Sequence, residues 1–124
     1  DRVLIDRLAY RFGSPRRSDI VVFRLPGSNE DLIKRVIALP GDLVAISPGV
    51  VRINGHVVQE PYIRYVEPYT YGPQRVPAGQ YFVLGDNRVV SYDSHIWGFL
   101  PQSYLYGRVM VTYWPVTDFH LYGL

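Results

Sequence analysis

The chain has 124 residues, of which 48% are hydrophobic, 15% aromatic and 19% charged, a composition typical of one folded domain rather than of a disordered chain. It contains no cysteine, which excludes disulfides and thiolate metal sites, and no apolar run reaches the roughly 18 residues of a membrane-spanning helix. The net charge of +2 combines twelve arginines with one lysine and shows no dense basic cluster, which argues against nucleic-acid binding.

Short runs of alternating hydrophobic and β-branched residues, separated by glycine and proline, predict an all-β chain. No segment keeps a helical period over ten or more residues. Asn54 and Gly55 tolerate the positive φ angles of a type I′ turn, which predicts a hairpin at this point. The predicted strands, in chain order, are residues 3–8, 19–24, 32–37, 43–47, 50–53, 56–59, 81–84 and 108–113.

The segment 60–77 contains four tyrosines and four prolines. This composition favours an extended flap or a protruding hairpin arm at the surface over a core strand. The chain also opens directly into a predicted strand, without a turn or cap before Val3. We therefore expect the natural protein to begin upstream of Asp1.

Lys34 is the only lysine in the sequence, and it stands beside Arg35 in the predicted strand 32–37. Side chains alternate along a strand, so Lys34 and Arg35 should point to opposite faces. If the Lys34 face is apolar, burial disfavours the ammonium form and lowers its pKa, and a neutral amine could then act as a base. Arginine cannot take this role, because it does not deprotonate in proteins. The alternative is an ordinary lysine whose stem packs while its ammonium reaches water.

A polar loop, residues 85–98, follows the apolar strand predicted at 81–84. Asp, Asn and Ser side chains commonly bond to their own backbone in turns, so each polar residue here has a purely structural alternative. Their concentration in one loop favours a functional site.

Three segments, taken together and in this order, resemble the type I signal peptidases, also called leader peptidases, which are serine/lysine peptidases of the S26 type. Residues 17–23 are similar to the family's R-G-D-I-V-V-F strand, residues 34–42 to its K-R-V-I-G-L-P-G-D box, and residues 85–98 to its G-D-N-R…S-x-D-S-R-x-W-G box. The likeness runs almost from end to end. It implies an all-β fold in which two antiparallel sheets form a coiled, partly barrel-like domain with a protruding hairpin arm within 60–77.

The resemblance implies an endopeptidase that removes signal peptides after Ala-x-Ala-like sites, with Lys34 as the general base of a Ser/Lys dyad. The family's nucleophilic serine lies in an S-M-x-P-T segment that no serine of this sequence matches. We therefore expect residues 1–124 to be a single catalytic domain that lacks its N-terminal membrane anchor and nucleophile segment, and to be inactive alone. The oxyanion hole would also come from that segment.

Supporting roles follow from the same resemblance. Ser91 would hydrogen-bond the Lys34 amine and orient it, while Asp86 would pair with Arg35 behind the strand. The other positions of the third box expected to support the site are Gly85, Asn87 and Asp93.

The resemblance also implies a substrate site. Val3, Val22 and Ile33 match positions that line shallow pockets for small P1 and P3 residues. Asp31, Leu32 and Ile33 would pair with the extended substrate as an added strand, so that main-chain bonds give affinity and the pockets give selectivity.

The chain departs from the family pattern at several positions. Ser18 and Ala38 replace glycines, and Val89-Val90 replace a polar pair. His95 replaces the arginine expected to pair with Asp93, and an imidazole is mostly neutral above about pH 6.5 unless a carboxylate raises its pKa. The same histidine occurs in cyanobacterial and thylakoid members, so the resemblance favours that lineage. A role for His95 as the catalytic base is the less favoured interpretation.

His56 and His120 have no partners at metal-ligand spacing, so we predict surface positions for both, with no metal and no cofactor. Trp97, Trp114 and the tyrosine-rich flap would either pack in the core or form an apolar apron against lipid, and we favour core packing for the tryptophans. The implied partners are the signal peptides of preproteins and the membrane lipid surface, not nucleic acid. The implied location is membrane-anchored, with the catalytic domain on the trans side, at the periplasmic or extracytoplasmic face or in the thylakoid lumen.

Two alternatives stay open at this point. One is a processing peptidase of the same clan, such as a mitochondrial inner-membrane or conjugative pilin maturation peptidase, which tests on different preproteins would separate. The other is a non-catalytic β-barrel binding module, in which Lys34 and Ser91 have no chemical role. A water-like pKa for Lys34 would favour the binding module.

Overall fold

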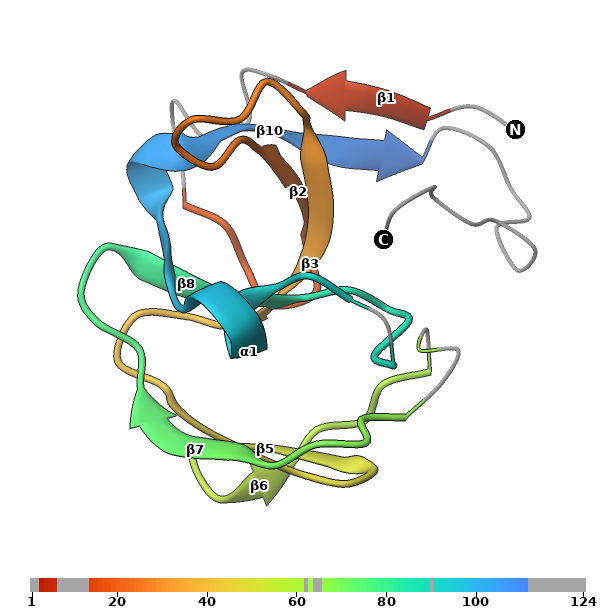
Figure 1. Ribbon diagram of the computed structural model, residues 1–124, viewed down its shortest axis with the longest axis vertical. Helices are drawn as coiled ribbons and strands as arrows, with labels where there is room; N and C mark the ends of the chain where they lie inside the picture. The colour runs from red at the N-terminus through yellow and green to blue at the C-terminus, as the bar shows by residue number, and fades with distance from the viewer. Residues whose placement is uncertain (1–2, 7–13, 62, 64–65, 90, 112–124) are drawn as a thin grey trace.

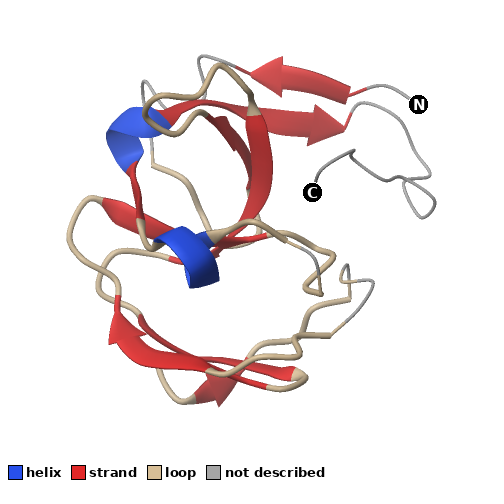
Figure 2. Ribbon diagram, viewed as in Figure 1, coloured by secondary structure: helices blue, strands red, loops and turns tan. Residues whose placement is uncertain are grey.

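The computed structural model describes residues 3–6, 14–61, 63, 66–89 and 91–111 (Figure 1). Within them, strands form nearly all of the regular structure, and the helical segments are short (Figure 2). The elements are β1 (Val3–Asp6), β2 (Ile20–Phe23), β3 (Leu32–Ala38), β4 (Leu43–Ser47), β5 (Val50–Ile53), β6 (His56–Val57), β7 (Tyr71–Arg75), β8 (Gln80–Leu84), α1 (Ser94–Trp97), β9 (Leu100–Pro101), the 3₁₀ turn η2 (Gln102–Tyr104) and β10 (Leu105–Val111).

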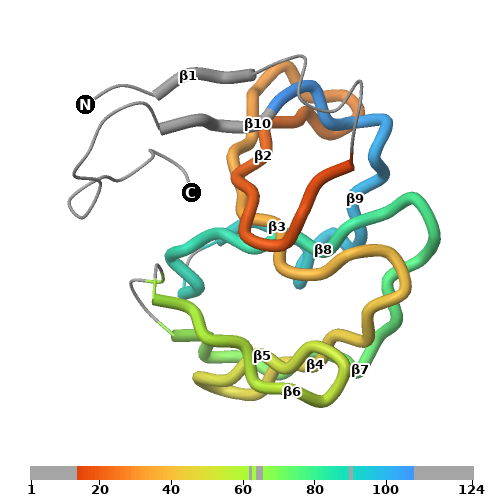
Figure 3. Tube along the Cα trace, turned by 180° about the vertical axis from the view of Figure 1, so that it is seen from behind, coloured from red at the N-terminus to blue at the C-terminus, as the bar shows by residue number. Residues whose placement is uncertain are grey.

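Two antiparallel sheets are present, which confirms the predicted fold class. The first sheet has the strand order β1-β10-β2-β3-β8-β9 and the second β6-β5-β4-β7, so the described strands form two open sheets rather than a closed barrel. In Figure 1 the strands β1, β10 and β2 lie at the top, while β5, β6 and β7 lie at the bottom. Seen from behind in Figure 3, β4 runs beside β5 and β7 in this lower sheet.

The hairpin predicted at Asn54-Gly55 is confirmed. Strands β5 and β6 pair in antiparallel register, with Arg52 opposite Val57 and Ile53 opposite His56. Asn54 has φ 54° and Gly55 has φ 83°, as a tight turn of this kind requires. His56 is exposed on this hairpin, as expected.

The segment 60–77 differs from the expected protruding arm, because residues 71–75 form strand β7 at the edge of the lower sheet. Arg75 lies opposite Leu43 of β4, and Gln74 lies opposite Val44. Proline is tolerated in an edge strand, so Pro73 does not prevent this pairing. The sequence pattern missed the strand because glycine and proline interrupt its alternation.

Two apolar cores lie on opposite faces of β8. The upper core consists of Val21, Phe23, Val36, Tyr81, Val83 and Leu100. The lower core consists of Ile37, Ala38, Val44, Ile46, Val51, Ile53, Val76, Phe82 and Leu84. Alternate residues of β8 thus enter different cores, and this explains why residues 81–84 form a continuous apolar run rather than an alternating one.

Trp97 packs against the upper core, with its ring edge-on to Phe23 at a centroid distance of 5.8 Å. The predicted core position is therefore confirmed for Trp97. Trp114 and His120 lie outside the described residues, as do the ends of the predicted strands 3–8 and 108–113. The short helix α1, which no periodicity predicted, lies near the centre of the molecule beside β8 (Figure 1).

Candidate active site

Lys34 lies on β3 opposite Val21 of β2, and directly opposed residues of antiparallel strands share a sheet face. Val21 and the next residue on the same face, Val36, belong to the upper core. The lysine is consequently buried, with 5% of its surface exposed. Burial lowers the pKa of the Lys34 amine, while the carboxylates of Asp93 and Asp86 oppose this shift. The shift favours the neutral amine, which is the form that can accept a proton.

Arg35 points to the opposite face, as the alternation predicted, and pairs with Asp86. Its Nε donates to Asp86 Oδ1 at 3.0 Å, and a terminal nitrogen donates to Oδ2 at 2.8 Å. A third hydrogen bond, of 3.0 Å, goes to the carbonyl of Ser18. This two-point pair joins the middle of β3, directly after Lys34, to the loop that follows β8.

The backbone N–H of Gly85 brings two predicted site residues together at the end of β8. It donates to Ser91 Oγ and to Asp93 Oδ2, both at 3.0 Å. Both side chains are buried, and burial makes this shared contact rigid. A hydrogen bond between Ser91 and Lys34 stays a prediction. Asn87 lies in the same loop, and its buried Oδ1 has no hydrogen-bond partner among the described residues.

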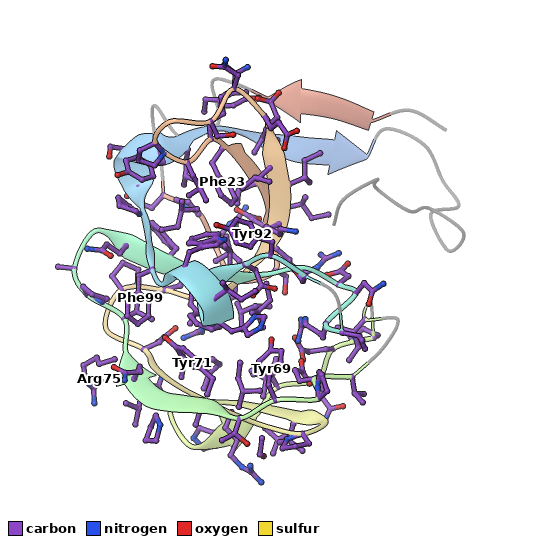
Figure 4. The ribbon with its side chains drawn as sticks, viewed as in Figure 1. Phe23, Tyr69, Tyr71, Arg75, Tyr92 and Phe99 are labelled. Atoms are coloured by element: carbon purple, nitrogen blue, oxygen red, sulfur yellow. The ribbon has the colours of Figure 1, made fainter. Side chains whose placement is uncertain are left out.

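Asp93 reaches His95 with its second carboxylate oxygen. Oδ1 accepts a 3.2 Å hydrogen bond from the backbone N–H of His95, which caps α1, and is also in hydrogen-bonding contact with Nδ1 of the imidazole. The imidazole lies flat on the ring of Tyr69, with 3.8 Å between ring centroids and 5° between planes. In Figure 4, Tyr69 points from the lower part of the molecule toward this central region. The position of the family arginine is thus occupied by a histidine that keeps contact with Asp93.

Sequence reasoning missed a buried ionic cluster next to the site. Arg88 has no exposed surface, donates through Nε to the Gly85 carbonyl at 2.6 Å, and pairs with both Glu60 and Glu67. The available signal was the arginine of the third family box, which has to find a carboxylate if it is buried. Its partners lie in the segment 60–77, far away in sequence, so no local pattern could identify them.

The predicted substrate residues lie at a partly open edge of β3. Leu32, Ile33 and Lys34 pair with β2 on one side, whereas the described pairing with β8 on the other side begins at Arg35. Ile33 is half-buried and lies opposite the fully buried Val22 on the face away from Lys34. An extended peptide could therefore pair with residues 31–33.

The remaining predicted substrate residues are Asp31, directly before β3, and Val3, in β1. Asp31 is exposed at the start of this edge, and its Oδ1 accepts a 2.6 Å hydrogen bond from Arg24. Val3 is in β1, where its backbone lies opposite Val111, but its side chain is outside the described part of the structure.

Comparisons with known proteins show which family the chain resembles. The family model described as signal peptidase, peptidase S26, matches residues 1–114. Signal peptidase I from Leptolyngbya laminosa is 46% identical over 94% of this chain and 61% of its own length, and probable signal peptidase I-2 from Synechocystis is 48% identical over 94% and 56%. Thylakoidal processing peptidase 1 from Arabidopsis thaliana is 40% identical over 93% of this chain and 37% of its own length. The chain thus spans about three fifths or less of these relatives.

A solved structure is similar as well. The crystal structure of a signal peptidase I from Enterococcus faecalis has a TM-score of 0.63 and 32% identity, and covers 77% of this chain and 97% of that chain. The expected likeness to cyanobacterial and thylakoid proteins is confirmed by the relatives named above.

Proposed function

Because this chain belongs to the S26 signal peptidase family, we propose that residues 1–124 form the catalytic domain of a signal peptidase I, a serine endopeptidase that removes signal peptides. The observation that supports this most directly is the buried Lys34 amine, whose pKa is lowered by burial on an apolar face. A lysine in a non-catalytic binding module has no need of such burial, which costs free energy. The serine nucleophile would come from the family's S-M-x-P-T segment.

The proposed reaction is acyl transfer. The neutral Lys34 amine takes the proton of the serine hydroxyl while the serine oxygen attacks the scissile carbonyl. The carbon–nitrogen bond then breaks, and the lysine ammonium returns its proton to the leaving amine. Water, deprotonated by the same lysine, hydrolyses the acyl-enzyme ester and frees the serine.

The proposed substrate lies as an added strand beside residues 31–33. The scissile carbonyl of such a strand lies close to the sheet plane, while its side chains project to the two faces. A base on the Lys34 face and pockets on the Ile33 and Val22 face can therefore serve one peptide. These apolar residues, with Val3, would line pockets that accept small P1 and P3 side chains.

The proposed support for Lys34 comes from its neighbours in the third box. The pair of Arg35 and Asp86 holds the strand from behind, and Ser91 would orient the amine from the loop. Gly85, Asn87 and Asp93 would keep that loop in place. These residues act on the position and charge of Lys34, not on the substrate.

We also propose that the domain works beside a membrane, anchored on the trans side, where signal peptides emerge. No helix within the described residues is long and apolar enough to span a bilayer. Val89, Tyr92 and Ile96 expose 53%, 54% and 57% of their surface on the loop and helix that follow β8, and such apolar side chains suit contact with lipid. Co-sedimentation with phospholipid vesicles, lost when Tyr92 and Ile96 become Ser, tests this placement.

Cleavage of a preprotein with an Ala-x-Ala site, by this chain joined to its serine-bearing segment, tests the activity. Lys34→Ala and Lys34→Arg should each lower kcat/KM by about 10²-fold or more, because neither side chain can accept the serine proton. Arg52→Ala, which removes an exposed basic residue of the lower sheet, is the matched control and should cleave normally. No cleavage by the folded wild type would favour the binding module instead.

A further inference from the structure

His95 combines contacts that a surface histidine does not need. Its ring is stacked on Tyr69, and its Nδ1 meets a carboxylate, Asp93, that is fully buried. The imidazole itself is only partly buried, so protons can reach it from solvent. The ring therefore links solvent to a buried carboxylate beside the lysine.

We propose that His95 is a positioning residue that sets, through Asp93, the electrostatic field at the Lys34 amine. The proposal rests on the proposed function, because it concerns the base of the same site. It assigns to His95 no contact with substrate and no proton transfer in the reaction.

Hydrogen bonds and strand pairing relate Asp93 to the strand that carries Lys34. One oxygen of Asp93 meets the imidazole, and the other accepts from the Gly85 N–H at 3.0 Å. Gly85 follows β8, whose last residue, Leu84, lies opposite Arg35, the neighbour of Lys34 on β3. Asp93 is thereby held at the end of β8 that pairs with β3 next to Lys34.

The groups packed around His95 are of types that ordinarily keep their charge near neutral pH. Tyr69 stays neutral, because burial raises the pKa of its phenol, with nearby Asp93 adding to the shift. The other charged groups beyond Tyr69 are Arg88, Glu60 and Glu67, and those beyond Asp93 are Lys34 and the pair of Arg35 with Asp86. Among these side-chain types, imidazole is the one that ordinarily changes charge between about pH 5 and 8.

The direction in which a charge at position 95 changes the pKa of Lys34 follows from the negative charge of Asp93. The negative charge of Asp93 favours the ammonium form of Lys34 and so opposes the lowering of its pKa by burial. A positive charge on His95 offsets Asp93, whereas a neutral imidazole leaves its charge uncompensated. A fixed positive charge at position 95 should therefore lower the pKa of Lys34 relative to a neutral side chain there.

The test uses the single lysine of the chain. With ¹³C-labelled lysine, the Lys34 side chain gives one set of resonances, and its pKa is read from a pH titration. His95→Arg should lower this pKa relative to the wild type, and His95→Gln should not.

His56→Arg is the matched control, because it places the same charge at an exposed histidine of the lower sheet. This variant should leave the Lys34 titration as in the wild type. An equal response of the Lys34 pKa to His95→Arg and His56→Arg, or no difference between His95→Arg and His95→Gln, would overturn the proposal.

Cleavage by the serine-bearing protein separates this proposal from the proposed function. On the acid limb of its pH profile, His95→Arg should raise kcat/KM about two- to tenfold over His95→Gln, since each unit of base pKa changes the free amine tenfold. If His95→Arg lowers the Lys34 pKa but the wild type does not cleave, the peptidase activity is refuted and the role of His95 is not. Cleavage whose acid limb is the same in both variants refutes the role of His95 alone.

Discussion

Lys34 is 5% exposed on an apolar sheet face, so its charge is costly in the folded protein. Burial lowers its pKa on folding, which means that the unfolded chain binds more protons between the folded and the unfolded pKa. In that window the free energy of unfolding rises with pH. Above the unfolded pKa of about 10.4, the destabilisation caused by the buried charge is fully removed. The burial that favours the neutral amine thus lowers stability near neutral pH.

Replacing Lys34 with methionine should remove the titratable amine and also remove the cost of burying it. Lys34→Met keeps a similar apolar stem and removes the buried amine, so we expect the free energy of unfolding at pH 7 to rise by about 0.5–2 kcal/mol. Urea denaturation followed by circular dichroism measures this change. Lys34→Arg keeps a charge that cannot be lost and should instead lower the free energy of unfolding. A methionine variant less stable than the wild type would show that the amine is well solvated or well paired.

Gly72 is a second residue whose identity is dictated by its surroundings. Its φ is 74°, and a Cβ atom there would lie 2.4 Å from the carbonyl oxygen of Val44 in the neighbouring strand. Gly72→Ala should therefore lower the free energy of unfolding by roughly 2–5 kcal/mol, through strain and overlap together. Gly79→Ala is the control, because φ is 71° with nothing within 4 Å of the added Cβ, and it should cost about 1–2 kcal/mol. Similar costs at both positions would contradict the close approach to β4.

At the scale of elements, the loop after β8 is held by charges rather than by apolar packing. Arg88 connects this loop to the segment before β7, since its guanidinium meets Glu60 and Glu67 and its Nε meets the Gly85 carbonyl. The same loop carries Ser91 and Asp93, which meet at the Gly85 N–H. The ionic cluster therefore supports the backbone on which the site is built.

Removing Arg88 should be costly for this reason. Arg88→Met leaves two buried carboxylates without their cation, and we expect a loss of about 3–5 kcal/mol at pH 7 in thermal or urea unfolding. The penalty should shrink as pH falls, because protonation removes the uncompensated negative charge. Arg52→Met, at an exposed position, should change stability by less than about 0.5 kcal/mol. A loss that is independent of pH would indicate missing packing rather than missing charge.

Asp42, in the turn between β3 and β4, joins this turn to the segment before β2 and to the turn between β5 and β6. Its carboxylate accepts two bonds of 2.8 Å and one of 3.2 Å from Arg17, one of 3.0 Å from Asn54, and one of 2.8 Å from the Leu39 N–H. Burial alone would raise its pKa, but these donors hold it below the ordinary value. The carboxylate is therefore most stabilising when ionised.

The corresponding prediction concerns acid stability. The folded pKa of Asp42 is depressed, so its contribution is present above the unfolded pKa of about 3.9 and is lost as pH falls below it. Asp42→Asn should cost about 1–2 kcal/mol at pH 7, and this difference from the wild type should narrow below about pH 4. Urea titrations at several pH values measure it, with Glu30→Gln as an exposed-carboxylate comparison. A constant difference across pH would contradict the role of the ionised form.

At the scale of the whole molecule, the sequence predicted most strands and the opposite orientations of Lys34 and Arg35. It predicted the segments between the strands less well. All eight predicted strands overlap strands of the structure, and Lys34 and Arg35 occupy opposite faces as their spacing required. Strand β7 was missed because glycine and proline interrupt its alternation, and the close approach of Gly72 to β4 leaves no local pattern. Helix α1 has four residues, too few for a helical period. The contacts of Arg88 and of Tyr69 join distant segments, so they follow from the fold and not from the sequence spacing.

Strand β8 makes one cooperative unit of the two sheets, because Tyr81 and Val83 enter the upper core while Phe82 and Leu84 enter the lower core. A cavity in either core should therefore weaken both. Val51→Ala removes apolar volume from the lower core alone and should cost about 2–3 kcal/mol.

Native-state hydrogen exchange measures how this loss is distributed, since the slowest amides of each sheet report the free energy of global opening. We expect Val51→Ala to lower that free energy equally for amides of β5 in the lower sheet and of β2 in the upper sheet. Val21→Ala, in the upper core, should act in the same way from the opposite side. Faster exchange in β5 with unchanged exchange in β2 would show that the sheets open independently and that β8 does not couple them.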